Sequence, residues 1–227
     1  VFVAQNLGAA LLFRGGSPET RELTPWLAVF AVCLLQLPMI AVFALARGLW
    51  PAHYAGRMSS REMSPMAAAK EALPLFIMWL PLVWAATLVW SGILSILERL
   101  GVVGEVQAQE LITLFTGGGD PIALGLLVLM AIILAPLVEE IIFRGCIYRF
   151  LKSQTPLLTA QCISGAVFAL LHANLLSFVP LMLVGVLLAR VYEKTGSLLV
   201  ATWFHAFFNA FSLGMLFLTS LSDNLPT

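Results

Sequence analysis

The sequence predicts an all-α, polytopic transmembrane helical bundle. Hydrophobic residues make up 60% of the 227 residues, charged residues make up only 11%, and the mean hydropathy is +0.97. A soluble domain carries about 25% charged residues, because its surface faces water. Apolar runs of about 20 residues, long enough to cross a hydrocarbon core about 30 Å thick, recur along the chain. These observations exclude a soluble globular domain.

Apolar windows of about 20 residues predict six spans in order along the chain. They cover approximately residues 26–48, 73–97, 121–143, 157–176, 177–193 and 198–219. Residues 1–13 are also apolar but too short to cross a bilayer, and they are compatible with the end of a truncated seventh span. We expect these helices to form a single membrane domain over residues 1–227.

Polar segments separate the predicted spans. Residues 14–25, 51–72 and 98–120 have the composition of linkers. Within the second of these, residues 57–72 fit either a helix on the membrane surface or a solvated loop. The sequence Ser153-Gln-Thr-Pro156 predicts a tight hairpin between the third and fourth spans.

Positive charges predict the orientation of the bundle. Nine of the twelve Lys and Arg residues follow the first, third or fifth span. By the positive-inside rule, the side that carries these nine residues faces the cytoplasm. The formal net charge is zero and the basic residues are scattered, so no nucleic-acid partner is expected. The nine residues are Arg47, Arg57, Arg61, Lys70, Arg144, Arg149, Lys152, Arg190 and Lys194.

Two adjacent glutamates lie at the end of the third apolar run, where a membrane helix tolerates charge poorly. An ionisable residue at membrane depth costs about 2.5 kcal/mol or more, so it usually faces a protein-lined cavity and marks function. Residues four apart share a helix face, so Arg144 can pair with Glu140 while Glu139 points elsewhere. Glu139 is therefore the better candidate for a general base. Pro136 is expected to loosen the helix and free a carbonyl near the glutamates.

Two histidines lie inside later apolar runs. They occur in Phe168-Ala-Leu-Leu-His172 and His205-Ala-Phe-Phe-Asn209, and each pair of end residues shares one helix face. The predicted hairpin is about equally distant from Glu139 and His172, so an antiparallel arrangement brings these two residues to one depth. His205 lies about 10 Å into the last span, counted from its cytoplasmic start. The polar residues are therefore expected to converge near the cytoplasmic side.

A carboxylate and an imidazole buried together favour acid–base chemistry. The His205 N–H and the Asn209 amide are suitable donors to an oxyanion, and they are equally suited to a structural hydrogen bond between helices. Three cysteines, Cys33, Cys146 and Cys162, have no paired spacing, so neither a disulfide framework nor a CxxC metal site is predicted.

The three polar motifs resemble those of a known family, the glutamate-type intramembrane proteases. This family includes the type II CAAX prenyl endopeptidases and the bacterial bacteriocin-processing (CPBP) proteins. Its motifs EExxxR, FxxxH and HxxxN correspond, in order, to Glu139-Glu140-Ile-Ile-Phe-Arg144, Phe168-Ala-Leu-Leu-His172 and His205-Ala-Phe-Phe-Asn209. The resemblance covers about residues 121–213, the expected catalytic core, and the first 120 residues carry no signature of the family.

The resemblance implies an intramembrane endopeptidase acting on a membrane-anchored or lipidated protein or peptide, in a prokaryotic cell membrane. It implies that Glu139 and His172 activate a water, that His205 and Asn209 bind the oxyanion, and that Glu140 with Arg144 supports the site. No metal or other cofactor is expected. Two alternatives stay open: a zinc-dependent membrane protease that uses the same residues, and a non-catalytic membrane scaffold or bacteriocin-immunity protein.

Other intramembrane protease classes fit the sequence less well. The chain contains no HExxH motif of the zinc membrane proteases. Gly117-Gly-Gly-Asp120 matches the GxGD motif of the aspartyl class, but the other aspartate, Asp223, lies in the tail. Cys162-Ile-Ser-Gly165 lacks the first glycine of the rhomboid serine motif, and a rhomboid site would leave the two glutamates unexplained.

Overall fold

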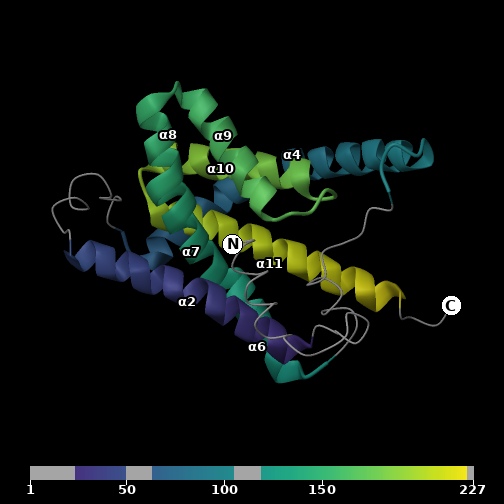
Figure 1. Ribbon diagram of the computed structural model, residues 1–227, viewed down its shortest axis with the longest axis horizontal. Helices are drawn as coiled ribbons and strands as arrows, with labels where there is room; N and C mark the ends of the chain where they lie inside the picture. Colours follow the sequence, from purple (N-terminus) through teal and green to yellow (C-terminus); the bar gives the residue numbers. More distant parts are fainter. Residues whose placement is uncertain (1–23, 50–62, 105–118, 224–227) are drawn as a thin grey trace, which may run out of the picture. The chain divides into compact units, whose positions relative to one another are not determined.

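The computed structural model describes residues 24–49, 63–104 and 119–223, and the regular elements in these ranges are helices (Figure 1). The predicted all-α membrane architecture is confirmed. The possible seventh span at residues 1–13 lies outside the described residues. In chain order the helices are α2 (Pro25–Leu49), α4 (Pro65–Arg99), α6 (Pro121–Leu129), η2 (Met130–Leu134), α7 (Ala135–Ile142), η3 (Phe143–Tyr148), α8 (Arg149–Gln154), α9 (Leu157–Leu171), α10 (Phe178–Thr195) and α11 (Leu198–Asp223).

Four helical stretches are long and apolar enough to cross a membrane: Pro25–Leu45, Pro65–Arg99, Pro121–Gln154 and Leu198–Thr219. Their apolar side chains are largely exposed, as expected of a surface that faces lipid rather than water. Helix α9 has 15 residues and is about 22 Å long, while α10 has 18 residues and carries Arg190, Glu193 and Lys194. Spans at α9 and α10 therefore remain predictions.

The boundaries of two predicted elements were wrong. Residues 65–72 do not form part of a separate surface helix, because they are the first two turns of α4, whose start is fixed by the Ser64 cap and Pro65. The predicted span 157–176 ends as a helix at Leu171, since Ala173 has a positive φ of 50°. The amide oxygen of Asn174 then accepts hydrogen bonds from the backbone N–H and hydroxyl of Ser177. Helix α10 follows at Phe178.

The chain divides into two compact units. One contains α2, the helix from Pro121 to Val138 and the part of α11 from Asn209 onward. The other contains α4, the chain from Glu139 through α10 and the part of α11 up to Phe208. Helices α7 and α11 each contribute residues to both units. The single membrane domain over residues 1–227 remains a prediction.

In the first unit, α2 packs on α6 through Ala28 and Leu127, which are both almost fully buried. Asp120 caps α6, since its Oδ1 accepts hydrogen bonds from the first backbone N–H groups of the helix. Its Oδ2 accepts a 2.8 Å hydrogen bond from the Trp26 indole N–H, which lowers the pKa of the Asp120 carboxyl. Asp120 of the GxGD sequence thus has a structural role in joining α2 to α6.

Two π-helical segments, η2 and η3, flank the short helix α7 that carries both glutamates. In η2 the Ala135 N–H bonds the Met130 carbonyl, five residues back. In the same register the Ala131 carbonyl would pair with residue 136, but Pro136 has no N–H. The Asn209 side-chain amide donates a 2.8 Å hydrogen bond to this carbonyl instead. The prediction that Pro136 frees a carbonyl is confirmed.

In the second unit, α8 and α9 are joined by the predicted hairpin, in which Thr155 is extended (Figure 1). Helix α9 then packs closely on α10 at Gly165 and Gly185. A Cβ added to Gly185 would lie 2.7 Å from the Cα of Gly165, and one added to Gly165 would lie 2.6 Å from the Met182 carbonyl oxygen. The two backbones are therefore in direct contact, and only glycine allows this approach.

We expect Gly185→Ala to lower the free energy of unfolding by about 1–3 kcal/mol, because the methyl group forces two backbones apart. The matched control is Gly92→Ala on α4, where an added Cβ meets nothing within 4 Å. This control should be neutral or more stable by up to about 1 kcal/mol, since alanine favours the helix. Thermal unfolding of the detergent-solubilised variants compares the two, and equal midpoints would contradict the close contact.

Candidate active site

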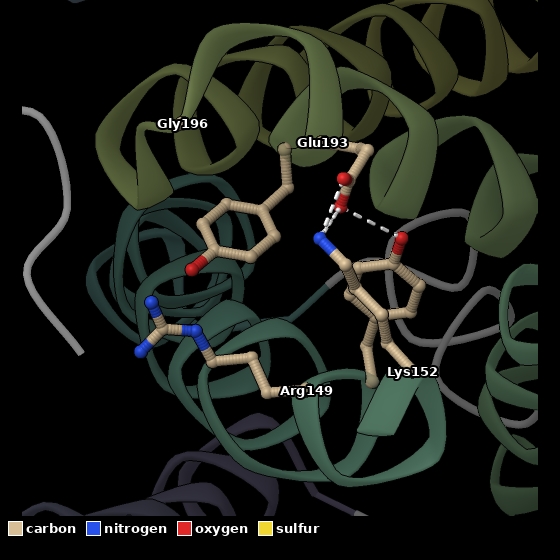
Figure 2. Close-up of a pocket in the computed structure, with 6 residues that line it drawn as sticks. Arg149, Lys152, Glu193 and Gly196 are labelled. Atoms are coloured by element: carbon tan, nitrogen blue, oxygen red, sulfur yellow. Dashed lines mark hydrogen bonds and ion pairs between the residues drawn. The ribbon is translucent and has the colours of Figure 1, made fainter. Parts of the chain in front are cut away.

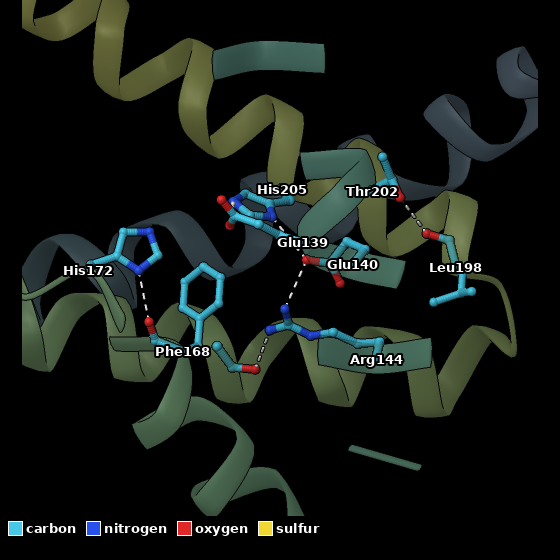
Figure 3. Close-up of polar contacts among 9 residues, drawn as sticks. Glu139, Glu140, Arg144, Phe168, His172, Leu198, Thr202 and His205 are labelled. Atoms are coloured by element: carbon cyan, nitrogen blue, oxygen red, sulfur yellow. Dashed lines mark hydrogen bonds and ion pairs between the residues drawn. The ribbon is translucent and has the colours of Figure 1, made fainter. Parts of the chain in front are cut away.

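The centre of the second unit is a completely buried ion pair. Arg144 donates a 2.9 Å hydrogen bond from Nη1 to Oε1 of Glu140, one helical turn earlier, and both side chains are 0% exposed (Figure 3). This confirms the pairing predicted from their spacing. A buried charge is costly unless it is paired and hydrogen-bonded, so the surroundings of Arg144 must satisfy the rest of the guanidinium.

The α9–α10 pair supplies these surroundings. Arg144 Nη2 donates a 2.8 Å hydrogen bond to the carbonyl oxygen of Gly185 on α10. The guanidinium carbon lies 5.2 Å from the centre of the Phe168 ring and 5.7 Å from that of Phe143. These are distances at which an aromatic face attracts a cation. Arg144 thus connects the helix of the glutamates to both α9 and α10.

His205 shares the oxygen of Glu140 that Arg144 binds. The distance from His205 Nδ1 to Glu140 Oε1 is 2.9 Å, and His205 is almost fully buried. A carboxylate accepts hydrogen bonds, so Nδ1 carries the proton and donates. In the neutral ring this leaves a lone pair on Nε2. Glu140 therefore fixes both the orientation and the tautomer of His205.

Glu139 differs from its neighbour in exposure and in partners. Its side chain is 27% exposed, and its Oε2 lies 3.8 Å from Nε2 of His205. That distance is too long for a hydrogen bond, and Oε2 has no hydrogen-bond partner among the described residues. Glu139 therefore presents a carboxylate oxygen that can accept a proton, while Glu140 is committed to Arg144 and His205.

His172 forms the C-terminal cap of α9 rather than lying within a longer span. Its Nδ1 lies 2.8 Å from the Phe168 carbonyl oxygen, so Nδ1–H donates and Nε2 keeps its lone pair. The Phe168 ring lies 4.7 Å from the His172 ring and 5.6 Å from the His205 ring, measured between centres. The Phe168 ring therefore contacts both imidazole rings (Figure 3).

Asn209 lies one turn after His205 on α11. Its amide nitrogen bonds the Ala131 carbonyl, which is the structural use that the sequence left open beside an oxyanion role. The Asn209 amide has a second N–H, so this hydrogen bond leaves one donor for other contacts.

Two contributors to this region were not predicted from the sequence: the carbonyl of Gly185 and the glycine contact that positions it. A backbone carbonyl has no signature in sequence. Gly165 and Gly185 are separated along the chain by the turn at Ala173, and nothing in a single sequence pairs them.

A metal centre does not emerge from these side chains. Within residues 24–49, 63–104 and 119–223, no three His, Cys, Asp or Glu side chains converge as metal ligands would. The arrangement of the described donors therefore does not fit the zinc alternative.

Residues 121–211 match the model of the family described as Type II CAAX prenyl endopeptidase Rce1-like. Over this segment the chain is similar to that family. The matched segment contains all three polar motifs and agrees with the expected core at residues 121–213. The chain is also 28% identical, over 145 residues, to the "Putative membrane peptidase YdiL" of Bacillus subtilis (strain 168). That alignment covers 63% of this chain and 57% of the relative. No solved structure matches this chain significantly.

We expect Glu140→Gln to lower the free energy of unfolding by about 3–5 kcal/mol, because it leaves Arg144 as an uncompensated buried charge. The matched control is Lys152→Met, which breaks the ion pair of Lys152 with Glu193, where the lysine side chain is 46% exposed. That loss should be about 0–1 kcal/mol. Thermal unfolding separates the two variants, and a Glu140→Gln midpoint as high as that of Lys152→Met would argue against the buried pair.

Proposed function

We propose that the protein is a membrane-embedded endopeptidase that hydrolyses a peptide bond with a water activated by Glu139 and His172. The observation that carries this proposal is the different exposure of the two glutamates: Glu139 is 27% exposed, whereas Glu140 is fully buried and its Oε1 is bound by Arg144 and His205. The family match and the name of the Bacillus relative support the same class of reaction.

In the proposed first step, Glu139 Oε2 accepts a proton from water as the water oxygen attacks the carbon of the scissile carbonyl. The lone pair on His172 Nε2 accepts a second hydrogen bond and orients that water, because its Nδ1–H is held by Phe168. The carbonyl oxygen then carries the negative charge of a tetrahedral intermediate. As the C–N bond breaks, the leaving amine takes the proton from Glu139. The products are a carboxylic acid and an amine, and transfer of the remaining water proton from the acid to the amine gives a carboxylate and an ammonium group.

His205 and Asn209 are the proposed donors to the oxyanion. Because Nδ1 of His205 carries the proton that bonds Glu140, Nε2 of the neutral ring accepts a hydrogen bond and cannot donate one to an oxyanion. His205 donates from Nε2 only as the imidazolium. The carboxylate oxygens of Glu140 and Glu139 lie 2.9 Å from Nδ1 and 3.8 Å from Nε2 of the ring. Asn209 would contribute the amide N–H that Ala131 does not use.

The proposed substrate is a membrane-anchored or lipidated protein or peptide, cleaved close to the cytoplasmic face of a prokaryotic cell membrane. The apolar helices are long enough to cross a bilayer, which supports a substrate segment that is anchored in the membrane and reaches the site by diffusing within it. Arg149, Lys152, Arg190 and Lys194 support a cytoplasmic position for the nearby helix ends by the positive-inside rule.

We expect Glu139→Gln to lower peptidase activity by about 100-fold or more while the thermal midpoint stays near that of the wild type. The amide has the shape of the carboxylate but accepts no proton from water, and Glu139 makes no hydrogen bond through Oε2 that the fold would lose. Glu98→Gln, on the exposed end of α4, is the matched control and should keep full activity. The measurement is cleavage of membrane proteins co-expressed with each variant. Turnover near the wild-type level in Glu139→Gln would reject this base, whereas no cleavage by the wild type or by the variant would favour a scaffold or immunity protein.

We expect chelators to leave the activity unchanged, because the proposed water activation uses a carboxylate and an imidazole and derives no step from a Lewis acid. Activity is measured before and after treatment with EDTA or phenanthroline, together with the zinc content of the purified protein. Stoichiometric zinc that is lost and restored together with activity would decide for the zinc protease.

A further inference from the structure

A second polar site lies in the same unit, outside the glutamate and histidine network. It is a cavity of about 190 Å³ where the end of α10 meets η3 and α8 (Figure 2). This volume is several times the ~30 Å³ that one water occupies in the liquid, so a small polar group fits. The residues that line the cavity are Tyr148, Arg149, Lys152, Tyr192, Glu193 and Gly196.

The charges of this cavity are not balanced. Glu193 accepts hydrogen bonds from the Tyr148 hydroxyl at 3.0 Å and from Lys152 Nζ at 2.8 Å. The carboxylate of Glu193 therefore compensates the charge of Lys152, and Figure 2 shows this contact. No second acidic residue lines the cavity, so the charge of Arg149 has no counter-charge among the lining residues. The guanidinium of Arg149 lies 5.8 Å from the centre of the Tyr192 ring, and its Nη1 is buried without a hydrogen-bond partner among the described residues.

The cavity adjoins a surface suited to lipid. Phe150, next to Arg149, is 66% exposed, and Leu157 and Leu158 at the start of α9 are also exposed. Helix α9 packs on α8, so these apolar side chains border the same end of the unit. A cationic cavity beside exposed apolar side chains, at the helix ends assigned to the cytoplasmic side, has the combination that recognises a charged headgroup and its acyl chains.

We propose that this cavity binds the phosphate group of an anionic phospholipid. Arg149 would donate from Nη1 to a phosphate oxygen, a geometry for which the planar guanidinium is well suited. The C-terminal end of α10 carries a partial negative charge of roughly half an electron, which disfavours a bound anion. The full charge of Arg149 outweighs it, and Lys194 in the last turn reduces it further. The proposal is independent of the peptidase assignment.

Lipid bound here would anchor the helix that carries the glutamates. Arg149 lies ten residues after Glu139 on the continuous helix Pro121–Gln154, a distance of about 15 Å along its axis. A phosphate held by Arg149 would therefore set the depth of Glu139 relative to the membrane surface.

The test measures retention of phosphatidylglycerol by native mass spectrometry of the detergent-solubilised full chain. We expect Arg149→Gln to weaken binding at least about tenfold, since one charge-assisted contact is lost. Arg190→Gln is the matched control, because it removes the same charge from the exposed face of α10 and should change binding less than about twofold. Arg149→Lys keeps the charge and should bind with intermediate strength, which distinguishes loss of charge from loss of folding.

Phosphatidylcholine and inorganic phosphate are the competing probes. Neither should displace phosphatidylglycerol at equal concentration, because one lacks net negative charge and the other lacks acyl chains. Displacement by inorganic phosphate would show a site for small anions and overturn the lipid assignment. Equal losses in Arg149→Gln and Arg190→Gln would overturn the cavity in favour of general surface attraction.

Discussion

The buried charge of Arg144 is the constraint on which the site in the second unit depends. A guanidinium with no exposed surface requires a counter-charge and hydrogen-bond acceptors, and in Arg144 both Nη1 and Nη2 are bonded while Nε has no partner among the described residues. One partner is Glu140 on its own helix, the second is the Gly185 carbonyl on α10, and the aromatic face of Phe168 comes from α9. Three helices are therefore fixed by one side chain. The remaining contact of Glu140, with His205, extends the same network to α11.

This network requires that α9 and α10 approach closely, and Gly165 and Gly185 make that possible. At the same point where Gly185 has no side chain, its carbonyl oxygen receives the hydrogen bond from Arg144. A side chain at Gly185 would both separate the helices and displace that oxygen. The helix that carries the two glutamates departs from regular α-helical geometry in the π segments on either side of α7. There Pro136 leaves the Ala131 carbonyl without a backbone partner, and the Asn209 amide donates a hydrogen bond to it. Irregular backbone is tolerated at membrane depth only where side chains satisfy it in this manner.

The sequence predicted what depends on local spacing. The pairing of Glu140 with Arg144 follows from the helical repeat, the hairpin before Leu157 follows from its turn residues, and the freed carbonyl follows from Pro136. The sequence did not predict where α9 ends or where α4 begins, because a positive φ at Ala173 and a cap at Ser64 are weak signals within apolar surroundings. The role of the Gly185 carbonyl depends on a crossing of two helices, and such a contact is a property of the folded chain. The contact of Phe168 with both His172 and His205 is of the same kind.

The different environments of two adjacent glutamates explain how one motif serves both structure and chemistry. Successive helical residues point about 100° apart, so Glu140 faces Arg144 while Glu139 faces His205 Nε2 and is partly exposed. If Glu140 took a proton, it would lose the negative charge that compensates Arg144, and that cation would be buried without a counter-charge. Glu139 loses nothing comparable when it takes a proton. The stability of the site and its proposed reactivity therefore depend on different carboxylates, and His205 is the side chain that faces both.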